Sequence, residues 1–105
     1  MNRILIIDDD RELCTLIKRS VLSENIEADC CNTGKEGLKK IREKDYQLVI
    51  LDIMMPGMDG IQLVKYIREN HPDTKVVVVA HLYGTPGKVD ELNTIIKKHG
   101  AILVE

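Results

Sequence analysis

Residues 48–60 read LVILDIMMPGMDG, an apolar run that ends at Asp52 and passes into a loop containing Pro and Gly. The apolar residues are continuous rather than alternating, which is typical of a strand buried on both faces of a sheet. Pro56 and Gly57 are residues that favour loops and end regular structure. We therefore predict a buried strand over residues 46–51, closed by Asp52.

The same pattern recurs along the chain. A second apolar run, residues 4–7, ends in Asp8, Asp9 and Asp10, and further predicted strands cover residues 26–31, 76–79 and 102–104. Apolar residues at helical spacing lie between these strands: they follow Asp10, include Leu38 and Ile41, and run from Ile61 to about Asn70. Strands that alternate with helices predict an α/β, doubly wound parallel sheet with helices on both faces.

Three aspartates stand at predicted strand ends, where such sheets place their ligand sites. Asp8, Asp9 and Asp52 would therefore meet at one edge of the sheet, and their charges would repel one another without a cation. Mg²⁺ suits oxygen ligands and leaves room for waters and phosphate oxygens. A carboxylate beside such an ion can attack phosphorus and form an acyl phosphate.

Composition narrows the function classes. The net charge of −2, without a basic stripe, argues against direct binding of nucleic acid by this domain. No apolar run is long enough for a membrane span and no leader is evident, so we expect no membrane contact and a cytoplasmic location. We interpret Cys14, Cys30 and Cys31 as three small apolar residues, since adjacent cysteines are poorly placed for a mutual disulfide.

Three segments together closely resemble the response regulator receiver family. They are ILIIDDD at residues 4–10, LVILDIMMPGMDG at 48–60 and PDTKVVVV at 72–79, in family-like order over at least residues 3–80. The resemblance implies a five-stranded sheet in the flavodoxin-like order 2-1-3-4-5. It also implies one receiver domain over residues 1–105, a signalling domain and not an enzyme, which assists its own phosphoryl transfer.

The resemblance assigns roles to individual residues. Asp52 matches the phosphoacceptor. Asp9 matches the acidic residue that binds Mg²⁺ directly, and Asp8 its neighbour, which acts mostly through water. The backbone carbonyl of Met54 would complete the metal ligands, and Pro56 and Gly57 would shape the edge of the site.

Partners also follow from the resemblance. The phosphoryl donor would be a phosphohistidine on a sensor histidine kinase or a phosphotransfer protein in a phosphorelay, with small acyl phosphates as substitutes. An output domain or a partner protein would receive the signal.

The sequence departs from the family at its switch position. Ala80 stands where the family has a Thr or Ser whose hydroxyl binds the phosphoryl group, and His81 replaces a small residue. His81 would act as a packing residue or narrow the access route. Met54 and Leu82 would flank the phosphoryl group with apolar side chains, which predicts a long-lived phosphorylated state.

The carboxyl-terminal part differs as well. The family has a Lys after the fifth strand, then a Pro and a fifth helix, whereas this sequence stops at Glu105, about where that Lys would stand. We expect either a truncated domain without the fifth helix or a protein without this cation. We also predict an irregular or displaced fourth helix that begins near Lys88 or Val89.

Competing interpretations remain at this stage. Asp8, Asp9 and Asp10 could form a solvated acidic cap on the first helix, and Asp52 a capping residue at a strand end, while Asp59 is interpreted as a residue that starts the third helix. The domain could be a degenerate receiver that binds partners independently of phosphorylation. A small phosphatase or a nucleotide-binding α/β enzyme is disfavoured, because Met54 occupies the position of a second catalytic acid and no Gly-rich phosphate loop follows the first strand.

Overall fold

The computed structural model describes residues 2–55, 59–80 and 86–104, without the side chains of 86–89. Its centre is one parallel sheet in the order β2-β1-β3-β4-β5, which confirms the predicted class and strand order. The strands are β1 (Asn2–Ile7), β2 (Ile26–Cys31), β3 (Leu48–Asp52), β4 (Lys75–Val79) and β5 (Ile102–Val104).

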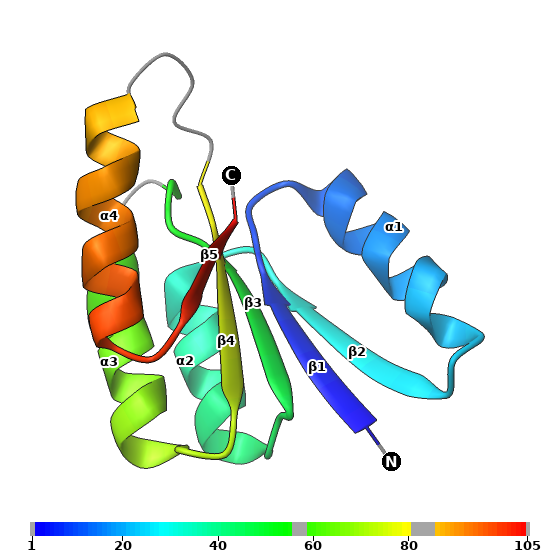
Figure 1. Ribbon diagram of the computed structural model, residues 1–105. Coiled ribbons are helices and arrows are strands. Elements are labelled where there is room, and N and C mark those ends of the chain that lie inside the picture. The colour runs from blue at the N-terminus through cyan, green and yellow to red at the C-terminus, as the bar shows by residue number, and fades with distance from the viewer. Residues whose placement is uncertain (1, 56–58, 81–85, 105) are drawn as a thin grey trace.

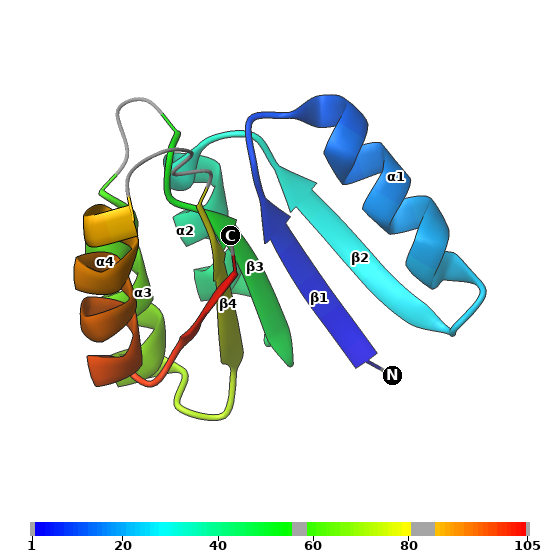
Figure 2. The same cartoon turned by 45° about the horizontal axis from the view of Figure 1, so that its top comes forward.

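Helices cover the two faces of the sheet unequally. They are α1 (Arg11–Leu22), α2 (Gly34–Glu43), α3 (Gly60–Asn70) and α4 (Pro86–Lys98). Figure 1 shows α1 alone on one face, beside β2, and the other three helices on the opposite face. The tilted view in Figure 2 shows the same two layers and brings forward the edge where the strands end. We call this edge the carboxyl rim.

The core follows the alternation of side chains along the strands. Leu5, Ile7, Val49 and Leu51 point to the side of α2, α3 and α4, and all four are fully buried. The intervening residues of β1 face α1 and form a smaller cluster whose buried members are Ile4, Ile6 and Cys14. Burial on both sides explains why the strand sequences are continuously apolar.

Capping residues anchor three helices at the carboxyl rim. Asp10, Thr33 and Asp59 precede α1, α2 and α3, and each accepts a hydrogen bond from a backbone amide in the first turn. This confirms Asp59 as a helix-start residue. Gly60 then packs tightly, since a Cβ there would lie 2.6 Å from Cγ2 of Ile53. Helix α3 therefore begins directly against the turn that follows Asp52.

The fourth helix differs from the prediction. It begins at Pro86, two residues before Lys88, and continues as a regular α-helix for 13 residues, so the expected start near Lys88 or Val89 and the expected irregularity are wrong, whereas a displaced helix stays a prediction. Proline is well suited to the first helical position, where its missing amide hydrogen would have no partner. None of the helices among the described residues has the length and apolar character that a membrane crossing requires.

The cysteines differ from the prediction too. Cys14 and Cys30 form a disulfide, with their Cα atoms 6.1 Å apart, whereas Cys31 is free and buried. The interpretation as three small apolar residues is therefore wrong for Cys14 and Cys30. It considered only the adjacent pair, but α1 packs on β2 and brings Cys14 against Cys30.

Candidate functional site

The two most buried aspartates lie at the ends of neighbouring strands. Ile7 and Leu51 pair across β1 and β3, and Asp8 and Asp52 are the residues that follow them. Asp8 is 7% exposed and Asp52 is 8% exposed. The sheet order reverses at this pair of strands, which is where open α/β sheets bind ligands.

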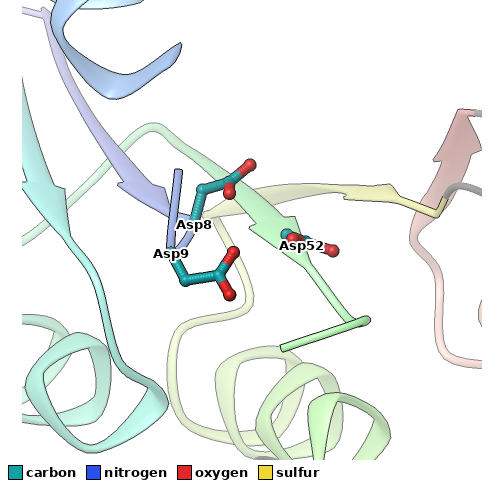
Figure 3. Close-up of side chains that lie close together, drawn as sticks. All are labelled: Asp8, Asp9 and Asp52. Atoms are coloured by element: carbon teal, nitrogen blue, oxygen red, sulfur yellow. The ribbon is translucent and has the colours of Figure 1, made fainter. Parts of the chain in front are cut away.

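Asp9 joins these two residues to form the acidic cluster, defined as Asp8, Asp9 and Asp52. One carboxylate oxygen from each residue lies within 4.8 Å of the other two. Figure 3 shows the three side chains gathered where β1 and β3 end. Asp9 is exposed, so the cluster opens toward solvent on its side.

Backbone amides hold the two buried carboxylates. The amide of Asp10 donates to Oδ1 of Asp8 at 2.9 Å, and the amide of Met54 donates to Oδ1 of Asp52 at 2.8 Å. Both bonds use Oδ1, so a ligand can be bound through Oδ2. The two carboxylates are therefore oriented before any ligand arrives.

The electrostatics of the cluster favour a cation. Burial raises the pKa of Asp8, the hydrogen bond from Asp10 opposes this rise, and the charges of Asp52 and Asp9 add to it. A raised pKa means that the ionised carboxylate is disfavoured at this position. A hard divalent cation would relieve the repulsion, and the donor set of carboxylate oxygens without His or Cys fits Mg²⁺.

The other predicted site residues are not part of the acidic cluster. Met54 lies in the turn after β3 with its side chain 51% exposed, and Ala80 follows β4 fully buried. The amide of Ala80 donates to the carbonyl of Val104, so its backbone continues the pairing with β5. Four further predicted residues lie outside the described part of the chain: Pro56, Gly57, His81 and Leu82.

Asn32 was missed as a neighbour of the site. Its Nδ2 donates to the backbone carbonyl of Asp8 at 2.9 Å, and the amide of Asp8 donates to the carbonyl of Cys31 at 3.0 Å. The parallel pairing of β1 with β2 could have revealed it, since Ile7 opposes Cys31 and the next residues must meet at the same rim.

A family model for the response regulator receiver domain matches residues 4–98. The chain belongs to this family. It is a receiver domain of the response regulators of two-component systems. Among similar proteins, the regulatory protein VanRB of Enterococcus faecalis is 39% identical over 80 residues, covering 76% of this chain and 36% of the relative. The transcriptional regulatory protein PcoR of Escherichia coli is 34% identical over 77 residues, covering 73% of this chain and 34% of the relative.

Solved receiver structures share the fold. The response regulator TrrA of Thermotoga maritima, solved in complex with Mg²⁺ and BeF, is 30% identical with a TM-score of 0.78, covering 100% of this chain and 87% of that one. A CheY-like receiver domain from Methanospirillum hungatei is 27% identical with a TM-score of 0.81, covering 98% of this chain and 81% of that one. The receiver domain spans about a third of the length of the curated relatives it matches.

Proposed function

We propose that this receiver domain accepts a phosphoryl group on Asp52 in a reaction that depends on Mg²⁺. The observation that supports this most directly is the acidic cluster, with its carboxylate oxygens within 4.8 Å of one another at the switch point of the sheet. Asp9 and Asp52 would bind the ion directly, Asp8 mostly through water, and the carbonyl of Met54 would complete the protein ligands.

The chemistry follows from the position of Asp52. Its Oδ1 accepts from the amide of Met54 and has a second lone pair that could bind the ion, which leaves Oδ2 as the nucleophile that attacks phosphorus. The new bond is an acyl phosphate, and the electron pair of the broken bond leaves with the imidazole nitrogen of the donor histidine. The bound ion would neutralise charge on the phosphoryl oxygens. Asp8 and Asp9 would keep the ion beside Asp52.

The protein that donates the phosphoryl group and the protein or domain that responds to phosphorylation would both be separate from this receiver domain. The donor would be a phosphohistidine of a sensor histidine kinase or phosphotransfer protein. PcoR is named a transcriptional regulatory protein, so an output domain that binds DNA is a fitting partner for a receiver of this kind. The receiver itself would bind no nucleic acid, and it would work in the cytoplasm.

The test uses acetyl phosphate with Mg²⁺ and intact-protein mass spectrometry. The wild-type protein should gain one phosphoryl group, and Asp52→Asn should gain none. Asp59→Asn is the matched control: it removes a carboxylate near the same rim, but asparagine still caps α3. Absence of phosphorylation in the wild type, with acetyl phosphate and beryllofluoride both giving no response, would contradict the proposal.

The degenerate-receiver alternative is not favoured by the family match. Ala80 concerns the step after phosphorylation, because the acidic cluster does not use its side chain. Phosphoryl acceptance on Asp52 therefore does not depend on a hydroxyl at position 80.

A further inference from the structure

The Cys14–Cys30 disulfide joins the first helix to the edge strand next to the acidic cluster. Cys14 is the only buried residue of α1, while Leu16 and Leu22 of the same helix are 62% and 75% exposed. The other apolar contacts of α1 with the sheet come from Ile17 and Val21, which are partly buried against the same cluster as Cys14. The covalent bond to β2 adds to this packing.

The disulfide also contacts the backbone of the acidic cluster. Sγ of Cys14 lies 3.7 Å from the carbonyl oxygen of Asp8 and 3.8 Å from Nδ2 of Asn32. Asn32 donates to that same carbonyl oxygen at 2.9 Å. Movement of the Cys14 side chain would therefore alter the surroundings of the Asp8 carbonyl, both through their direct contact and through Asn32.

The two cysteines differ in their exposure. Cys30 is partly exposed, whereas Cys14 is 3% exposed, so an incoming thiol or disulfide can reach Cys30 first. Cys31 cannot compete for this bond. Successive side chains of a strand point to opposite faces, and Cys31 is buried in the cluster on the far side of the sheet.

We propose that Cys14 and Cys30 are a reversible redox site, and that their disulfide holds α1 and the Asp8–Asp10 segment in the geometry that assembles the acidic cluster. The effect on metal binding rests on the proposed function, whereas the redox site itself does not. Reduction would free α1 from β2 and loosen the segment from which Asp8 and Asp9 project.

The exchange reaction balances with a small-molecule disulfide as oxidant. The Cys30 thiolate attacks one sulfur of oxidised glutathione, which forms a mixed disulfide and releases one glutathione thiolate. The Cys14 thiolate then attacks Sγ of Cys30, and the second glutathione leaves. Two electrons pass to glutathione, and the two protons of the cysteine thiols end on the two released thiolates.

The first test counts thiols after equilibration with oxidised or reduced glutathione. Alkylation under denaturing conditions, followed by mass spectrometry, should find one free thiol in the oxidised protein and three in the reduced protein. The Cys31→Ala variant should keep this response, and Cys30→Ala should lose it. Three reactive thiols in the wild type after oxidised glutathione would overturn the redox site.

The second test follows the amides of Leu13 and Cys14, which donate to the side chain and backbone of Asp10. Their hydrogen exchange should be faster in the reduced protein, and the Mg²⁺ dissociation constant should rise about fivefold, at the low end of coupling between two sites. Equal exchange rates in the two states would refute the structural coupling. Failure of the oxidised protein to bind Mg²⁺ would contradict the proposed function instead, and the thiol count and exchange rates would still decide the redox site.

Discussion

Asp8 and Asp52 follow the last residue pair shared by β1 and β3, so two nearly buried carboxylates meet where the sheet changes direction. Burial, and then the charge of Asp52, disfavour the ionised form of Asp8 as long as no cation is bound. The free energy of unfolding should therefore depend on pH and on Mg²⁺ through the charge of Asp8.

Asp8→Asn should stabilise the metal-free protein by about 1 kcal/mol, the usual size of a single-substitution effect. Asparagine keeps the oxygen that accepts from Asp10 and removes the disfavoured charge. Because the folded pKa of Asp8 is raised above 3.8, its contribution makes the wild type more stable as the pH falls through the folded pKa toward 3.8. The Asp8→Asn variant should not gain this stability as the pH falls.

Urea unfolding of the two proteins across this pH range, with and without Mg²⁺, measures the effect. Mg²⁺ should raise the urea midpoint of the wild type more than that of Asp8→Asn. Equal stability of the two proteins at neutral pH without Mg²⁺ would show that the charge of Asp8 is not disfavoured. An equal response of the two proteins to Mg²⁺ would show that the charge of Asp8 does not contribute to binding the ion.

Ala80→Thr should destabilise the metal-free protein by about 1–3 kcal/mol, because Ala80 is fully buried and the larger side chain must be accommodated. The resemblance to the family places a hydroxyl at this position against the phosphoryl group. Beryllofluoride with Mg²⁺ should therefore raise the melting temperature of Ala80→Thr more than that of the wild type. Ala80→Val is the control, since it has nearly the same shape without the hydroxyl. If Thr and Val gain equally, no hydroxyl bond to the phosphoryl mimic is formed.

The acyl phosphate on Asp52 should last for minutes or longer. The side chain of Met54 lies half-exposed in the turn after Asp52, and a thioether binds an attacking water poorly. Met54→Asn should shorten the lifetime, as followed by the loss of phosphoprotein on a phosphate-affinity gel. Leu22→Asn, an exposed site at the end of α1, should leave it unchanged. A wild-type half-life of seconds would contradict this account; Leu82, the second flanking residue, lies outside the described part of the chain.

Asp29 should contribute to stability in mildly acidic and neutral solution. Burial opposes ionisation of this carboxylate, but the hydroxyl of Tyr46 at 2.6 Å and the ammonium of Lys44 at 3.2 Å outweigh it, so its pKa is lowered. The stabilisation is fully present above the ordinary value of 3.8 and is lost as the pH falls through the lower folded pKa. Asp29→Asn should cost about 1.5–3 kcal/mol at neutral pH, as expected for hydrogen bonds to a charged group.

Chemical unfolding at neutral pH and at acidic pH measures this contribution. The exposed Asp73→Asn change serves as the control and should alter stability by less than about 0.5 kcal/mol. The difference between wild type and Asp29→Asn should shrink in acid. A difference that stays constant would mean that the charge of Asp29 has no part in it.

Sequence reasoning reached the fold because the decisive signals are local. The apolar runs before Asp8 and Asp52 mark buried parallel strands, and the parallel arrangement brings their ends together without any knowledge of side-chain geometry. The acidic cluster could therefore be predicted residue by residue. Its roles in metal binding and phosphoryl transfer stay predictions.

Features that depend on how the helices and strands pack on one another could not be predicted from the sequence. The Cys14–Cys30 bond requires the position of α1 on β2, which no local pattern specifies. The contact of Asn32 with Asp8 could be predicted only from the register between β1 and β2. Helix α4 starts at Pro86, two residues before the predicted start, because proline favours the first helical position as well as loops.

The disulfide has a further consequence for the denatured chain. It closes a loop between residues 16 positions apart, which contains most of α1 and the turn into β2. A crosslink over a loop of this length restricts the denatured ensemble by about 3 kcal/mol in the chain-entropy model. The oxidised chain should therefore remain more compact when unfolded and give a shallower dependence of the unfolding free energy on urea than the reduced chain.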